Sequence, residues 1–361
     1  MRDDNVNSEA LADAKSVGLR YVDDHLPGIC RKPYKDGFRY LDEKGALIKD
    51  ESERKRIQSL AIPPAWTDVW ICRWNNGHIQ ATGRDAKLRK QYRYHAHWRK
   101  VRDESKYDRM LAFGRLLPGI RSKINAALSL SGLPREKILA SVVYLLENTL
   151  MRIGNREYAR TNDSFGMTTL RKKHVRIDGT VIQFEFRGKS GVRHSIKLQD
   201  RRLAGIIRRT RDLPGQELFQ YVGEDGERHK IGSSEVNEYL RELCGDDYTA
   251  KDFRTWAGTV LAMTALQENL VFESEAQAKK NIVQAIESVA KKLGNTPAIC
   301  RKCYVHPGVI DAYLDGTLAQ MSKRKATSKT PLSADDELNA DEILVLKLLE
   351  KSRKKTSADK A

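Results

Sequence analysis

The sequence predicts an α+β protein, with a small antiparallel β domain at its N-terminal side and a mainly α-helical domain that carries a β-hairpin sheet. Up to about residue 82, short runs rich in β-branched and aromatic residues alternate with the turn sequences K-D-G, E-K-G and N-N-G. Beyond residue 103, apolar residues recur at helical spacing over longer segments. We expect three parts, over residues 1–100, 101–320 and 321–361.

The β-rich part begins after a lead-in segment. Residues 7–24 are expected to form a helix or an extended segment. Strands are predicted around Tyr40, Cys72 and Ile79, where F-R-Y-L, W-I-C-R-W and H-I-Q-A-T stand between Gly-containing turns. Because these strands are short and follow one another closely, we predict that they pair in antiparallel fashion.

A basic stretch with aromatic residues closes this part. It reads G-R-D-A-K-L-R-K-Q-Y-R-Y-H-A-H-W-R-K over residues 83–100 and contains Gln91, Tyr92 and Tyr94. Cations contact phosphates and aromatic rings stack on sugars or bases, so this density favours a nucleic-acid-binding surface. A solvated basic face beside a small aromatic cluster is the alternative.

Helices follow in the second part. They are predicted over residues 107–128, 134–153, 201–211 and 233–244. Arg152 stands in the last turn of the second of these, before Gly154 and Asn155, which are expected to end it. The dipole of a helix alone favours a cation at such a place. Arg152 therefore has a structural as well as a functional interpretation.

A β-hairpin interrupts the helices. Over residues 180–186 the chain alternates, with Ile182, Phe184 and Phe186 on one face, and the turn R-G-K-S-G follows. Lys189 is then at the tip of the hairpin. A Lys at such a tip is usually solvated, but a primary amine on a mobile loop can also deliver a proton to a leaving oxygen.

Residues 251–307 organise the rest of the chain. They begin K-D-F-R-T-W, where apolar residues at helical spacing place Arg254 on a packed helix. A second helix follows and is expected to end at Gly294 after two lysines.

A tight turn is predicted directly after that glycine. Thr296 and Pro297 are typical of the first residues of a helix, so Asn295 is expected between two helices. Tyr304 is predicted on the short helix that follows, and Pro307 is expected to end it.

These residue types suit attack on a phosphodiester. Arg offers a charged planar fork to the non-bridging oxygens, and Asn offers a neutral amide donor. Tyr offers an oxygen nucleophile that also leaves well, because its reference pKa is about 10. Each has a commoner structural role, since a Tyr on a basic helix is usually packing and an Asn after a helical Gly is usually a cap. The combination favours catalysis.

The combination also resembles a known family. K-D-F-R-T-W, then G-N-T-P, then a Tyr nine residues beyond the Asn is similar to the poxvirus and bacterial type IB DNA topoisomerases, whose catalytic domain is of the tyrosine recombinase kind. The catalytic residues that this resemblance implies are Arg152, Lys189, Arg254, Asn295 and Tyr304. The DNA-binding residues predicted with it are Gln91, Tyr92, Tyr94, Tyr158 and Lys251.

Two positions depart from the poxvirus pattern. That pattern has His where Asn295 stands, and Asn can donate a hydrogen bond but cannot carry charge. It has Asp where Ser190 follows Lys189. The resemblance covers about residues 22–314, so a predicted flexible basic linker at 321–330 and a predicted helix at 333–355 lie outside it.

The resemblance implies an enzyme that relaxes supercoiled DNA by transient single-strand cleavage through a 3′-phosphotyrosyl intermediate, without ATP, metal or cofactor. Arg152 and Arg254 are expected to hold the oxygens of the phosphorane, and Lys189 to protonate the leaving 5′-oxygen. No cluster of acidic residues in the sequence resembles a two-metal site. The expected partner is double-stranded DNA, clamped by a monomer.

Composition agrees with a polyanionic partner. The formal net charge is +17, and no apolar run approaches the roughly 18 residues of a membrane span. The first residues contain no apolar stretch, so no signal peptide is expected. Five cysteines form no disulfide framework, and the C-x-x-C of Cys300 and Cys303 is better explained by core packing than by zinc or redox chemistry. We therefore expect a cytoplasmic protein of the nucleoid.

Two other functions remain open at this point. A tyrosine site-specific recombinase shares the catalytic residues, but it usually carries H-x-x-R where this chain has K-D-F-R, and it lacks the β-rich domain with Q-Y-x-Y. A non-catalytic basic DNA-binding protein would need only the charge.

Overall fold

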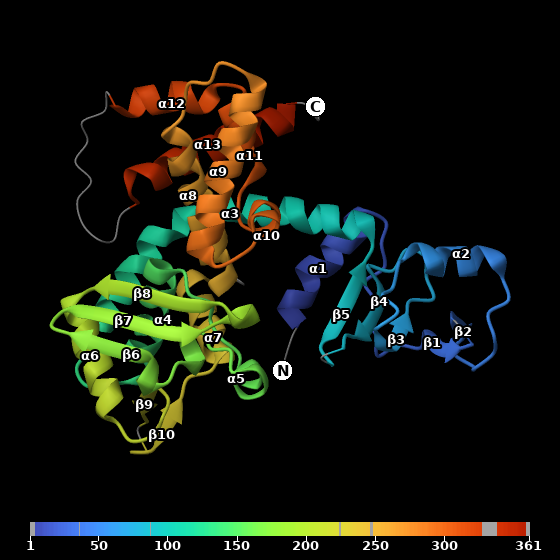
Figure 1. The fold of residues 1–361 in the computed structure, drawn as a ribbon, viewed down its shortest axis with the longest axis horizontal. Helices are drawn as coiled ribbons and strands as arrows, with labels where there is room; N and C mark the ends of the chain where they lie inside the picture. Colours follow the sequence, from blue (N-terminus) through green and yellow to red (C-terminus); the bar gives the residue numbers. More distant parts are fainter. Residues whose placement is uncertain are drawn as a thin grey trace. The chain divides into compact units, whose positions relative to one another are not determined.

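The computed structural model describes residues 4–35, 37–86, 88–223, 225–245, 248–326 and 338–358 (Figure 1). Contacts divide the chain into two compact units, Met1–Tyr107 and Asp108–Ala361. The predicted α+β class is confirmed, with an antiparallel sheet in the first unit and mainly helices in the second. Within the described ranges, no helix is both long and apolar enough to cross a bilayer.

The first unit is built on a five-stranded antiparallel sheet in the order β2-β1-β3-β4-β5. Its elements are α1 (Asp4–Ser16), β1 (Ile29–Tyr34), β2 (Gly37–Leu41), α2 (Glu51–Ser59), β3 (Thr67–Ile71), β4 (Ile79–Arg84) and β5 (Lys90–Tyr94). The strands predicted around Tyr40 and Ile79 are present as β2 and β4, and the one predicted around Cys72 lies earlier, because β3 ends at Ile71. Helix α1 fills part of the predicted lead-in.

Two apolar clusters hold the first unit together. One packs α2 on the sheet through Ile29, Ile57, Val69, Ile71 and Ala81. The other joins Ala10, Ala14, Leu19 and Trp98. Helix α2 was not expected from the sequence, and it begins where the Asp50 carboxylate accepts a hydrogen bond from the backbone N–H of Glu53.

The second unit combines a three-stranded antiparallel sheet with a group of helices. The division between the units falls within α3 (Ala96–Leu128). After it come α4 (Arg135–Thr149), α5 (Arg156–Asn162), β6 (Val175–Asp178), β7 (Val181–Arg187), β8 (Arg193–Gln199), α6 (Arg201–Asp212), β9 (Gln220–Val222), β10 (Arg228–Lys230) and α7 (Ser233–Cys244). The chain continues with α8 (Ala250–Gln267), α9 (Glu275–Leu293), α10 (Pro297–Cys303), α11 (Pro307–Leu314), α12 (Thr317–Ala326) and α13 (Ala340–Ala358).

The predicted hairpin alternation is confirmed in β7. Ile182, Phe184 and Phe186 are all buried on one face, against which α6 packs. Strands β6, β7 and β8 form one sheet, and α8, α9, α11, α12 and α13 gather at the other end of this unit (Figure 1). A small cavity is lined by the hairpin tip between β7 and β8, by α8 and by the end of α9, and the candidate active site lies there.

The last helix belongs to the core of the second unit. Helix α13 packs on α8, α11 and α12. The Glu342 carboxylate accepts a hydrogen bond from the Trp256 indole at 3.1 Å and pairs with the Arg121 guanidinium at 2.7 Å. The linker predicted from residue 321 is wrong for residues 321–326, which belong to α12, and its remainder lies outside the described residues.

Candidate active site

Arg254 is placed by helix α8. The helix begins with a capping box, in which the Asp252 carboxylate accepts from the backbone N–H of Thr249 at 2.8 Å. One turn on, the Arg254 side chain is only 5% exposed. It donates to the carbonyl of Leu150, and to the carbonyl of Leu293 at 2.7 Å. Its Nε–H is buried and has no partner among the described atoms, so a donor remains for an anion.

Arg152 lies beyond α4, not in its last turn. The predicted helix over residues 134–153 is wrong at its end, because Leu150 adopts a left-handed conformation (φ 55°) and ends α4. Gly154 and Asn155 do not end a helix either, since the Asn155 side chain caps the start of α5. The dipole of α4 therefore does not explain Arg152. The segment is instead fixed by Met167, whose N–H donates to the Arg152 carbonyl at 2.8 Å.

Asn295 stands in the predicted turn between α9 and α10. Gly294 is left-handed (φ +60°), and Thr296 and Pro297 begin α10, as the sequence predicts. Arg152 donates to the Gly294 carbonyl at 2.8 Å and to the Asn295 Oδ1 at 2.6 Å. The Asn295 Nδ2 is buried without a partner in the part of the chain that the structure describes. Because its oxygen is engaged by Arg152, the amide presents its N–H₂ as a donor.

Tyr304 directly follows α10 and caps it, so its predicted place within the helix is wrong by one position. Pro307 does not end that helix but is the first residue of α11. The Arg254 guanidinium lies over the Tyr304 ring, 5.4 Å from its centroid. A Cβ on Gly258 would lie 2.6 Å from the Tyr304 carbonyl, so the chain approaches α8 closely only because that residue is Gly.

The two guanidiniums concentrate positive charge. Burial lowers the pKa of Arg254, with further lowering by Arg152, and the Tyr304 hydroxyl partly offsets both. Burial also lowers the pKa of Arg152. Both stay protonated, because an Arg guanidinium does not lose its proton inside proteins. Neither pairs with a carboxylate in the described ranges, and charges that are buried or half-buried without a counter-charge favour an anionic ligand.

Lys189 lies at the start of the hairpin tip, in the short turn Lys189–Gly191. Its side chain is exposed, and Ser190 and Gly191 after it are left-handed. A small cavity is lined by Lys189, Arg152 and Arg254 together. The structure therefore brings these predicted residues together from the hairpin, the loop after α4 and α8. His194 and Lys292 line the same cavity and were not singled out from the sequence.

The predicted DNA-binding residues lie in three elements. Tyr92 and Tyr94 share one exposed face of β5, where their rings stack with centroids 5.7 Å apart. Gln91 points to the other side and donates to Asp85 at 2.9 Å. Tyr158 is 42% exposed on α5, and Lys251 is exposed in the first turn of α8. Exposed aromatic rings beside cations are available to sugars and phosphates.

The C-x-x-C cysteines belong to packing. Cys300 is fully buried in α10, and burial raises the pKa of its thiol to about 11. Cys303 is half-buried, and the two form no disulfide. A buried thiol with a raised pKa has little reactive thiolate, which agrees with the predicted packing role.

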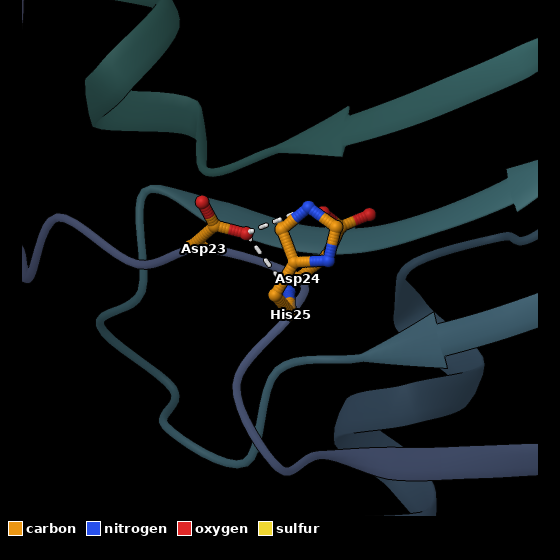
Figure 2. A group of neighbouring side chains, drawn as sticks. All are labelled: Asp23, Asp24 and His25. Atoms are coloured by element: carbon orange, nitrogen blue, oxygen red, sulfur yellow. Dashed lines mark hydrogen bonds and ion pairs between the residues drawn. The ribbon is translucent and has the colours of Figure 1, made fainter. Parts of the chain in front are cut away.

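One cluster in the first unit has groups at metal-binding distance. Figure 2 shows it, with Asp23, Asp24 and His25 close together. Asp23 accepts from the backbone N–H of His25 at 2.8 Å, and Asp24 pairs with Lys90 at 2.7 Å and accepts from Thr82 at 2.8 Å. These carboxylates already have donors, so we assign the cluster to local structure.

Comparisons with known proteins agree over most of the chain. A family model for the catalytic core of eukaryotic DNA topoisomerase I matches residues 95–331, and one for the N-terminal domain of bacterial DNA topoisomerase IB matches residues 37–85. The DNA topoisomerase 1B of Acanthamoeba polyphaga mimivirus is 33% identical over 305 residues, which cover 82% of this chain and 90% of the viral protein. The DNA topoisomerase 1B of Vaccinia virus (strain Copenhagen) is 25% identical, over 78% of this chain and 89% of that protein.

Proposed function

Because the chain belongs to the type IB DNA topoisomerases, we propose that Tyr304 is its nucleophile and that Arg152, Arg254, Asn295 and Lys189 complete the active site. The enzyme relaxes supercoiled DNA by transient cleavage of one strand, without ATP. The observation that supports the site is the pair of guanidiniums, Arg254 buried and Arg152 half-buried, together with two buried donors, Arg254 Nε and Asn295 Nδ2, that have no partner among the described atoms.

The reaction is a phosphoryl transfer between two oxygens. The Tyr304 oxygen attacks a backbone phosphorus, and the bond from phosphorus to the 5′-oxygen breaks. The phenolic proton passes to water, and Lys189 protonates the departing 5′-oxygen. A 3′-phosphotyrosyl bond and a free 5′-hydroxyl result. One phosphodiester replaces another, so the exchange is close to isoenergetic, and the 5′-hydroxyl reverses it after the duplex has rotated.

Two arginines and an amide are proposed to stabilise the negative charge of the transition state. The phosphorane gains negative charge on its non-bridging oxygens, and the donors of Arg152, Arg254 and Asn295 are already held in place to meet it. Asn295 acts as a neutral donor, so it takes no part in proton transfer. Exclusion of water strengthens each of these contacts.

We further propose that a single copy holds the duplex with both of its units, in the cytoplasm at the nucleoid. Exposed Tyr92 and Tyr94 on β5 would contact the duplex from the first unit, and Tyr158 and Lys251 from the second. The net charge of +17 supports binding to a polyanion.

A plasmid assay separates this function from its rivals. We expect relaxation of a negatively supercoiled plasmid that has no special recombination site, in EDTA and without ATP. Retarded migration without relaxation would instead indicate a non-catalytic binder. Activity confined to one inserted sequence, with exchange between two plasmids, would indicate a recombinase.

Lys189→Ala tests the residue of the proposed site whose side chain is exposed at the hairpin tip. If Lys189 protonates the 5′-oxygen, cleavage should slow by about 10²–10⁴, the usual range for general acid catalysis. A substrate with sulfur at the 5′-bridging position needs no proton, because a thiolate leaves unaided. The variant should cleave it nearly as fast as the wild type does in single-turnover assays.

The matched comparison is Arg152→Ala, which should stay slow on both substrates because it acts on the non-bridging oxygens. If sulfur does not restore cleavage by Lys189→Ala, Lys189 is only a phosphate contact. In that case the slope of binding against salt should fall by about one counterion.

A further inference from the structure

The ring of His194 lies between two glycines of the active site. His194 is on β8, paired with Phe186 of β7, and the two rings stack with centroids 5.1 Å apart. A Cβ on Gly188 would lie 2.6 Å from the His194 Cδ2 and Nε2, and a Cβ on Gly294 would lie 2.8 Å from its Cε1. The space that the ring fills exists because both neighbours are Gly.

These two glycines directly precede proposed catalytic residues. Gly188 precedes Lys189 at the hairpin tip, and Gly294 precedes Asn295 in the turn between α9 and α10. One imidazole therefore contacts the backbone of both segments, which are far apart in the sequence. It also lines the small cavity that Lys189, Arg152 and Arg254 share.

The hairpin tip is held mainly by backbone hydrogen bonds, among them one from the Gly191 N–H to the Gly188 carbonyl at 3.1 Å. Its closing hydrogen bond joins the Gly188 N–H to the Val192 carbonyl at 2.7 Å, and Lys189 and Val192 are both exposed. Ser190 and Gly191 adopt left-handed conformations. A side chain wedged under Gly188 would limit the movement of such a tip.

We propose that His194 is a positioning residue for strand cleavage, which wedges the Lys189 hairpin tip against the Asn295 turn so that Lys189 reaches the leaving 5′-oxygen. The inference rests on the proposed role of Lys189 as general acid. His194 itself transfers no proton and touches no reacting atom.

The charge state of the ring agrees with a wedge. Burial lowers the pKa of His194, and the nearby Arg152 and Arg254 lower it further. The imidazole is therefore neutral at pH 7 and adds no repulsion toward the Lys189 ammonium. A neutral ring with one face on Phe186 acts through its shape.

His194→Ala is expected to slow single-turnover cleavage of an ordinary DNA substrate by about 10–10², the scale of a misplaced catalytic group. Cleavage of the 5′-bridging sulfur substrate should stay near the wild-type rate, since that reaction does not need Lys189. His229→Ala is the matched control, because His229 also stacks on an aromatic ring of a hairpin, at 5.2 Å from Tyr221. It should cleave both substrates normally.

Each other outcome has a definite meaning. Normal cleavage of the ordinary substrate by His194→Ala would overturn the proposal. Equal slowing on both substrates would also overturn it, and would assign the ring to general packing. Lys189→Ala, measured beside it, tests the underlying function: if sulfur restores Lys189→Ala but not His194→Ala, only the positioning role of His194 fails.

A second pair of variants tests the contact itself. Gly188→Ala pushes a methyl group onto the ring and should slow cleavage of the ordinary substrate. In Gly188→Ala/His194→Ala the ring is gone, so the double variant should be no slower than His194→Ala alone. Residues in contact give such non-additive effects. Losses that simply multiply, in variants with wild-type thermal midpoints, would show that the ring and Gly188 act independently.

Discussion

Tyr304→Phe should bind duplex DNA with near-normal affinity and form no covalent adduct. Only the hydroxyl oxygen is removed, and the ring that lies under Arg254 at 5.4 Å is kept. The loss of the nucleophile leaves no other route to the 3′-phosphotyrosyl bond, so cleavage should fall below detection. Fluorescence anisotropy measures the binding, and a suicide DNA substrate that releases its 5′ fragment traps the adduct.

The matched control is Tyr221→Phe, which removes a hydroxyl from a tyrosine of the same unit that stacks on His229. It should form the adduct at the wild-type rate. Peptide mapping of the wild-type adduct should find the modified residue at Tyr304. An adduct that persists in Tyr304→Phe, mapped to another tyrosine, would overturn the assignment of the nucleophile.

Arg254→Lys should lose cleavage by about 10²–10³, the range seen when one donor to a developing oxyanion is removed. The guanidinium donates to the Leu150 and Leu293 carbonyls and still presents Nε–H. A single ammonium cannot hold that planar arrangement. Charge is conserved, so DNA binding should change little, and rapid-quench assays should locate the loss in the chemical step.

Arg211→Lys is the control for the same exchange, because Arg211 is exposed on α6. It should cleave DNA at the wild-type rate. Arg254 also joins the ends of α4 and α9 through its two carbonyl contacts, so the thermal midpoint of each variant must be measured. Near-wild-type cleavage by Arg254→Lys would mean that Arg254 serves only those helix ends and not the phosphate.

Local chemistry made part of the site predictable. Gly294, Thr296 and Pro297 have side chains that select a helix end and a helix start, so the Asn295 turn could be predicted from them. The alternation of Ile182, Phe184 and Phe186 likewise defined the hairpin face. In these places a short segment carries its own conformational preference.

Tertiary contacts decided the rest. Leu150 has no intrinsic preference for a left-handed conformation, so periodicity carried the predicted helix too far and misjudged the place of Arg152. The His194 wedge depends on two glycines that are 106 residues apart, Gly188 and Gly294. No local sequence pattern predicts that their backbones contact the same ring. The role of α13 was equally hidden, because the partners of Glu342 are far away in the sequence.

The buried Glu342 has a consequence for the order in which the protein matures. Trp256, which donates to it, precedes it by 86 residues. At about 5–20 residues per second, a ribosome makes the partner of Trp256 roughly 4–17 s after Trp256 itself. Until then the face of α8 that packs against α13 is exposed to solvent, and Arg121 has only one of its two carboxylate partners, Glu147. The packing around α8, the helix that carries Arg254, is therefore completed only after α13 has been translated.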